Sequence, residues 1–138
     1  MKKLLLSGLV LMAAIAVLNA QSAGSTRDGI FTLAQAKRGQ LAYSQHCMEC
    51  HGRELEGDVE TRPLAGDEFT NNWVGNTVGG LFDRIRITMP ANKAGTLDRQ
   101  TVADILAFVL LSNEYPAGKT ELTTRSELLQ LIKFELPK

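Results

Sequence analysis

The sequence has few of the side chains that hold metals or build aromatic cores. It contains two cysteines, two histidines and one tryptophan, and aromatic residues make up 6% of its 138 positions. A structural zinc site needs four ligands, so cysteine and histidine alone could form one only by using all four of these residues. With so few aromatic side chains, a small domain gains much if a large flat cofactor fills its core.

The chain also has no excess of basic residues. Its 15 lysines and arginines balance 15 aspartates and glutamates, and they form no basic stripe. Nucleic acid is therefore not an expected partner. A nearly neutral surface also argues against very strong electrostatic steering of other partners.

No apolar run is long enough for a typical membrane-spanning helix. The longest, from Leu4 to Leu18, is shorter than the roughly 20 residues that such a helix needs. Lys2 and Lys3 precede it and Ala20 follows it, which is typical of a cleaved secretory signal peptide. The alternative is a retained membrane anchor. We expect a signal peptide at residues 1–20, a periplasmic or secreted protein, and membrane contact only during export.

Both cysteines lie in the run Cys47-Met48-Glu49-Cys50-His51. The spacing C-x-x-C-H is typical of covalent haem attachment. Two thiols on one helical turn can add to vinyl groups of one porphyrin, and the next residue is then held with its imidazole facing the iron. The sequence therefore predicts one covalent haem c bound by Cys47 and Cys50, with His51 as an iron ligand.

Two other uses of this motif have less support. A redox disulfide between the cysteines favours a βαβ context and gives His51 no role. Half of a zinc site would leave only His46 as a further ligand of the usual kind.

One histidine leaves the second axial position of the iron open. His46 and Met48 adjoin or lie inside the attachment motif, so neither can reach the opposite face of the ring. Met1 and Met12 belong to the expected signal peptide, which leaves Met89. A methionine is more commonly flexible core filler. Beside a haem site, however, the His/Met pairing of cytochromes favours Met89 as the second iron ligand.

Apolar periodicity predicts three main helices, at about residues 33–47, from 78 to just before Met89, and at 99–112. Thr32 and Gln35 have the form of a capping box before the first helix. Thr77 and Asp98 are suitable N-caps for the second and third. The charged stretch 52–66 is expected to be a solvated loop.

Three further residues each allow two interpretations. Gly39 is either a tolerated surface glycine or the point where another helix crosses closely. Pro63 either shapes a turn or presents its carbonyl to the second ring nitrogen of His51. Trp73, beside a polar loop at 70–72, is either plain core or a donor from its indole N–H to a haem propionate.

The run from about Leu33 to Tyr115 resembles class I cytochromes c. The resemblance is carried by the haem motif, Pro63-Leu64, Met89-Pro90 and the pattern of residues 103–110. It implies an all-α, small cytochrome c fold in which three or more helices wrap around one covalently bound haem. It also implies that the first and last helices cross near Gly39, Tyr43 and Phe108, and that the Pro63 carbonyl contacts the haem histidine.

A narrower resemblance is to bacterial cytochromes that serve, or are fused to, PQQ-dependent dehydrogenases. Phe69, Trp73, residues 88–90 and residues 115–118 carry it. The expected domains are a flexible leader at 21–31, a cytochrome c domain at 32–115 and a tail at 116–138 packed on that domain.

The expected function is therefore one-electron transfer rather than catalysis. The chain would carry electrons between a periplasmic dehydrogenase or respiratory donor and a terminal acceptor, with a PQQ-dependent dehydrogenase and a terminal oxidase as candidate redox partners. It would also suit the electron-transfer subunit of a dehydrogenase. One alternative is a haem-binding subunit or sensor with a ligand-accessible iron. A peroxidase is disfavoured because no distal acid–base pair is present.

Overall fold

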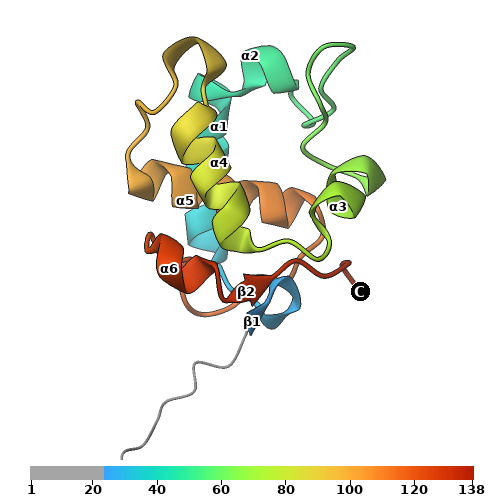
Figure 1. Cartoon of the computed structure of the whole chain (residues 1–138), viewed down its shortest axis with the longest axis vertical. Helices are drawn as coiled ribbons and strands as arrows, with labels where there is room; N and C mark the ends of the chain where they lie inside the picture. The colour runs from blue at the N-terminus through green and yellow to red at the C-terminus, as the bar shows by residue number, and fades with distance from the viewer. Residues whose placement is uncertain (1–23) are drawn as a thin grey trace, which may run out of the picture.

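The computed structural model describes residues 24–138, and most of this part of the chain is helical. Its helices are α1 Leu33–His46, α2 Met48–His51, α3 Asp67–Trp73, α4 Val78–Thr88, α5 Arg99–Ser112 and α6 Ser126–Leu129. Two 3-10 helices, Thr26–Asp28 and Ala91–Lys93, and two short strands, β1 Gly24–Ser25 and β2 Ile132–Lys133, complete the list. In Figure 1, α2, the loop after it, α3 and α4 form a ring in front of α1 and α5. The prediction of an all-α class is confirmed.

The helix ends follow local signals in the sequence. The Thr32 hydroxyl accepts a hydrogen bond from the Gln35 backbone N–H at 3.1 Å, and the Thr77 hydroxyl accepts one from Gly80 at 3.0 Å. The Asp98 carboxylate accepts from two backbone N–H groups in the first turn of α5. Each side chain satisfies helix donors that have no partner inside the helix, and so each fixes where its helix begins.

Gly39 lies where α1 crosses α5. A Cβ atom at this position would overlap the Asp104 backbone carbonyl. Close by, the rings of Tyr43 and Phe108 pack with their centroids 5.2 Å apart. The interpretation of Gly39 as the crossing point of two helices is confirmed, because only a residue without a side chain lets the two backbones approach this closely.

Replacing Gly39 by alanine should destabilise the fold, although the same change in an isolated helix is favourable. The added methyl group would force α1 and α5 apart, and overpacking of this kind typically costs about 1–3 kcal/mol. A chemical denaturation curve of the variant should show a lower midpoint. Gly80→Ala is a suitable control, since the added Cβ there would meet only side-chain atoms at 3.3 Å and beyond. An unchanged midpoint for Gly39→Ala would contradict the close crossing.

The side chain of Gln35 does not close the capping box predicted for it. It is fully buried, its amide donates to the Leu122 carbonyl at 3.0 Å, and its oxygen accepts from the Leu122 N–H at 2.6 Å. A buried backbone group without a hydrogen-bond partner costs about 1–3 kcal/mol. The Gln35 amide satisfies two such groups of Leu122, which stabilises the fold more than one bond at the end of the helix would. They also tie the C-terminal tail to α1.

Residues 24–31, which the sequence indicated as part of a flexible leader, are packed against the rest of the protein. Strand β1 pairs in parallel with β2, with Gly24 opposite Ile132. Thr26 and Phe31 are fully buried. The small polar residues suggested flexibility, but the C-terminal strand supplies backbone partners that composition does not reveal. The predicted signal peptide, residues 1–20, lies outside the described residues.

The tail after residue 115 folds back over the domain. Leu122, Leu129 and Phe134 are buried, and α6 packs on α4. The Ser126 hydroxyl donates to the Asp83 carboxylate at 2.5 Å, which joins the two helices at the surface. No helix within residues 24–138 is long and apolar enough to span a membrane.

A further prediction about local structure, made for the segment before Trp73, was wrong. Residues 70–72 were expected to form a polar loop, but they belong to α3. Asp67 and Glu68 lie in the first turn, where acidic side chains favour a helix. Helical spacing then brings Phe69 and Trp73 to the same face, with ring centroids 6.5 Å apart.

Candidate cofactor site

The two cysteines and the histidine that follows them lie on a single helical turn. Cys47 ends α1, where its N–H donates to the Tyr43 carbonyl at 2.8 Å, and also caps α2. Its own carbonyl accepts from Cys50 N–H at 3.2 Å and from His51 N–H at 2.9 Å. Residues three and four positions apart share one side of a helix. One turn therefore carries both thiols and the imidazole, with Cys47 three positions from Cys50 and four from His51.

Both thiols are free in the structure, with Cys47 half-buried and Cys50 exposed. Burial, and secondarily the neighbouring Cys50, raise the pKa of the Cys47 thiol to about 11. At neutral pH it is therefore a protonated thiol when no cofactor is attached. Within residues 24–138, no three His, Cys, Asp or Glu side chains are grouped so as to hold a metal ion. Neither the disulfide nor the zinc interpretation gains support from this arrangement.

The imidazole of His51 is held by the backbone of the following loop. Its Nδ1 lies 3.2 Å from the Arg62 carbonyl oxygen. A carbonyl can only accept, so Nδ1 must carry the proton in this contact, and Nε2 keeps its lone pair for a metal. The prediction named the Pro63 carbonyl, which is wrong by one residue. The Arg62 carbonyl belongs to the peptide bond that precedes the proline ring, and this peptide faces the histidine.

A second contact fixes the chain directly after His51. The buried Tyr43 side chain donates its hydroxyl to the Gly52 carbonyl at 2.6 Å. Burial raises the pKa of Tyr43, so this hydroxyl stays protonated and remains a donor. Sequence analysis gave Tyr43 only a packing role at the helix crossing. Together with the Arg62 carbonyl, it anchors the histidine on both sides.

Met89 is the residue at which α4 ends. Its N–H still donates to the Ile85 carbonyl at 2.9 Å, but its backbone is extended, with φ −117° and ψ 153°. Pro90 follows and disfavours a helical conformation for the residue before it. The Met89 side chain is half-buried. Figure 1 shows α4 running from the side of β2 towards the end of the molecule that carries α2.

Trp73 lies at the end of α3 and is half-buried. Its ring packs against Phe69, and against Phe134 with centroids 5.8 Å apart. The hydrogen bonds of residues 24–138 include none from its indole N–H. This leaves a donor available to a group outside the chain, since a tryptophan N–H that becomes buried usually finds a partner.

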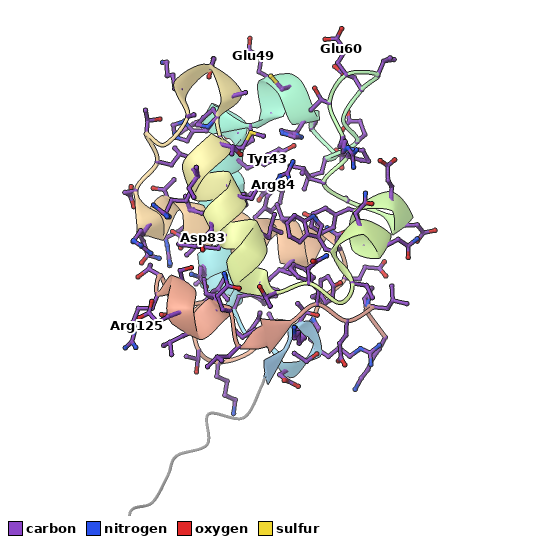
Figure 2. The ribbon with its side chains drawn as sticks, in the orientation of Figure 1. Tyr43, Glu49, Glu60, Asp83, Arg84 and Arg125 are labelled. Atoms are coloured by element: carbon purple, nitrogen blue, oxygen red, sulfur yellow. The ribbon has the colours of Figure 1, made fainter. Side chains whose placement is uncertain are left out.

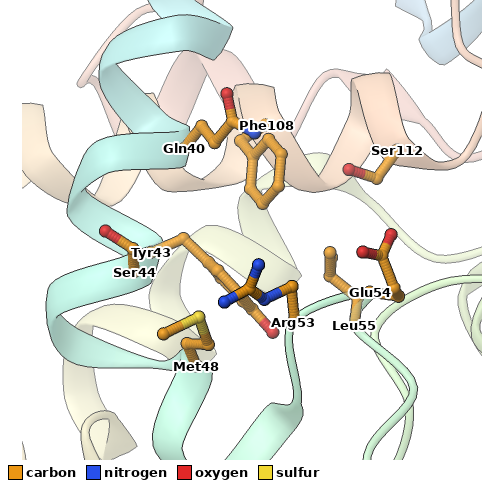
Figure 3. A pocket seen from close by; sticks show the side chains of 9 residues that line it. All are labelled: Gln40, Tyr43, Ser44, Met48, Arg53, Glu54, Leu55, Phe108 and Ser112. Atoms are coloured by element: carbon orange, nitrogen blue, oxygen red, sulfur yellow. The ribbon is translucent and has the colours of Figure 1, made fainter.

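A cavity of about 650 Å³ lies beside the attachment turn, between α1, α5 and the loop after α2 (Figure 3). It is lined by Gln40, Tyr43, Ser44, Met48, Arg53, Glu54, Leu55, Phe108 and Ser112. None of the predicted iron ligands lines it. It is therefore a neighbour of the cofactor site rather than the place where the iron would lie.

The loop after α2 has a charged, solvent-facing surface. Figure 2 shows Glu49 on α2 and Glu60 on the loop, both pointing away from the molecule. Asp58 accepts from the N–H groups of Glu60 and Thr61 at 2.8 and 2.7 Å, and these bonds lower its pKa. The acidic residues thus shape a solvated turn at the exposed end of the site, as the sequence predicted.

These residues fit a covalently attached haem. One helical turn carries two free thiols and an imidazole, and a backbone carbonyl facing Nδ1 of His51 favours the tautomer that leaves Nε2 free for a metal. The neutral, soft thioether of Met89 is the kind of second ligand that c-type cytochromes use. The indole N–H of Trp73 suits a haem carboxylate.

The fold and this donor set define the class of a c-type cytochrome with one haem. The sequence model of the family described as "Cytochrome C oxidase, cbb3-type, subunit III" matches residues 34–109, more than half of the chain, and the chain belongs to that family. Such a domain carries covalently bound haem c and transfers electrons. No curated protein sequence matches the chain.

The fold is also similar to a solved structure, the sulfane dehydrogenase SoxCD from Paracoccus pantotrophus. The TM-score is 0.50 with 20% sequence identity, over 78% of this chain and 62% of that chain. The chain thus spans less than two thirds of that protein chain. At this identity the likeness shows a common fold, the small cytochrome c fold that the sequence predicted.

Proposed function

We propose that this protein is an exported mono-haem cytochrome c that carries single electrons between a periplasmic dehydrogenase or respiratory donor and a terminal acceptor. The observation that carries the proposal is the attachment turn, which holds Cys47, Cys50 and His51 together while the Arg62 carbonyl contacts the imidazole. Export rests on the composition of residues 1–20.

The roles of the side chains follow from their chemistry. Cys47 and Cys50 would hold the haem through thioether bonds, and His51 Nε2 and the Met89 sulfur would bind its iron. Trp73 would donate its indole N–H to a haem carboxylate. When bound, the haem supplies reversible one-electron chemistry at its iron. With both of these side chains bound, the iron would offer substrates no open position, and this favours a carrier over an enzyme.

The position of Cys50 supports transfer at the edge of the haem. Its side chain is exposed, whereas Cys47 is half-buried. The thioether at Cys50 would therefore lie at the protein surface, where a partner can approach closely. We propose a dehydrogenase, for example a PQQ-dependent one, as donor, and a terminal oxidase as acceptor.

The proposal can be tested on full-length protein exported with the haem maturation machinery present. A reduced-minus-oxidised spectrum should show a c-type haem that stays with the polypeptide after denaturation and organic extraction. The ferrous protein should bind carbon monoxide only slowly at neutral pH. Mixing the reduced protein with candidate acceptors should then give single-exponential oxidation. Rapid binding of carbon monoxide would instead favour the haem-binding sensor with an accessible iron.

A further inference from the structure

Phe134, near the C-terminus, is the meeting point of the aromatic residues on one side of the protein. It is only 1% exposed. Its ring centroid lies 5.8 Å from that of Trp73, 6.4 Å from Phe69 and 6.1 Å from Tyr115. The first two belong to α3 and the third follows α5. A single side chain of the tail therefore joins segments that are far apart in the sequence.

The backbone around Phe134 also holds the turn between α3 and α4. The N–H of Phe134 donates to the Asn76 carbonyl at 3.0 Å, and its carbonyl accepts from the Gly75 N–H at 3.0 Å. Next to this pair, the Thr77 hydroxyl is bonded to the Gln130 side chain at 2.6 Å. Thr77 is the N-cap of α4, so the tail fixes the whole connection that leads from Trp73 into the helix ending at Met89.

The Trp73 ring lies at the end of a short helix and packs against the buried core. It is the last residue of a helix of seven residues, and the next residue, Val74, is exposed. Its aromatic packing partners are Phe69 within α3 and Phe134. Phe134 is the one among them that belongs to the tail.

We propose that Phe134 is a positioning residue for the haem, because it holds the Trp73 indole in the orientation in which its N–H reaches a haem carboxylate. This inference rests on the proposed function, in which Trp73 binds the cofactor. Phe134 lies outside residues 34–109, the part of the chain that matches the family. The tail would then help to orient a cofactor-binding side chain as well as stabilise the domain.

A hydrogen bond from Trp73 would stabilise the ionised carboxylate and disperse part of its negative charge. Without that bond, more negative charge acts on the iron. The ferric state carries one more positive charge than the ferrous state, so it gains more from this charge and the reduction potential falls. Loss of Phe134 should have this effect only through Trp73.

The test is a double-mutant cycle on the full-length holoprotein with Trp73→Phe, Phe134→Leu and the pair together. Leucine keeps an apolar side chain at the buried position, so the variant retains its core. Each single variant should have a lower reduction potential than the wild type. The double variant should match Trp73→Phe alone, because Phe134 has nothing left to position. The separate single variant Phe134→Tyr keeps the aromatic ring and should therefore have a reduction potential close to that of the wild type.

Fluorescence gives a second readout, since Trp73 is the only tryptophan in the chain. A nearby haem quenches its emission, and Phe134→Leu should increase that emission. Leu129→Ala is the matched control. Leu129 is equally buried in the tail but belongs to α6, which packs on α4. The Leu129→Ala variant should have a lower unfolding midpoint, but the reduction potential and the Trp73 emission of its folded form should be unchanged.

Three outcomes would overturn the proposal, and they are distinguishable. If the shifts of the two single variants add in the double variant, Phe134 does not act through Trp73. If Trp73→Phe keeps the wild-type potential, the role proposed for Trp73 fails and this inference fails with it. If the wild-type protein carries no covalent haem, the proposed function itself is wrong.

Discussion

Replacing both Cys47 and Cys50 by alanine should abolish covalent haem attachment. The two thiols are the only cysteines of the chain, so no other side chain can form a thioether bond in their place. The variant exported with the maturation machinery should show no haem on a denaturing gel stained for haem, against a strong band for the wild type. Any haem that remained would be lost on acid extraction.

The single variants separate attachment from folding. Cys47→Ala and Cys50→Ala each keep one thiol and should retain some covalent haem in reduced yield. His46→Ala is a close control, because His46 is exposed and directly precedes the motif. It should attach haem normally. Haem that stays bound to the double variant after extraction would show that the attachment site lies elsewhere.

The parts of the fold that the sequence predicted best are those set by local chemistry. Asp98 caps α5, which spans Arg99–Ser112 as expected, and Thr77 caps α4. The proline after Met89 ends α4 at the predicted place. Caps and prolines act on backbone groups within a few residues, so the sequence alone contains the whole interaction.

Two of the errors, at Gln35 and at residues 24–31, occur where a partner lies far away in the chain. Gln35 pairs with Leu122, which is 87 positions away, rather than with its own helix end. Gly24 and its neighbours pair with β2 near the C-terminus. In both cases the local pattern was consistent with the prediction, and a tertiary contact of lower free energy replaced it. No pattern of spacing along the chain would have indicated these pairs.

The candidate site shows the same division. The C-x-x-C-H spacing by itself indicates Cys47, Cys50 and His51 as candidates, because one helical turn holds all three. The residues that orient them were harder to find. The carbonyl facing His51 is that of Arg62 rather than Pro63. Arg62 lies 11 positions after His51, and the path of the loop between these two residues decides which peptide group turns towards the histidine. The role proposed for Phe134 depends on a tail that folds back over the domain.

The assignment of Met89 rests on elimination, and a substitution gives it the most direct test. Met89→Ala should keep covalent haem but lose the thioether–iron charge-transfer band of the ferric protein. The ferrous protein should then bind carbon monoxide rapidly. The reduction potential should fall, because a soft, neutral thioether favours the ferrous state. Axial ligands set haem potentials over a range of about 0.8 V, so the change should be well above experimental error.

Two further variants distinguish ligation from packing. Met89→Leu retains an apolar side chain of similar volume at the end of α4 and removes only the sulfur, so it should lose the band as completely as the alanine variant does. Met48→Ala removes the other methionine of residues 24–138, a half-buried residue inside the attachment turn, and should keep the band. A band that survives in Met89→Leu would exclude Met89 as the ligand. A band lost in Met48→Ala as well would indicate that the turn itself had moved. Loss in the two Met89 variants alone would establish an iron with a protein ligand on each face, which is the property that separates an electron carrier from a haem with an open coordination position.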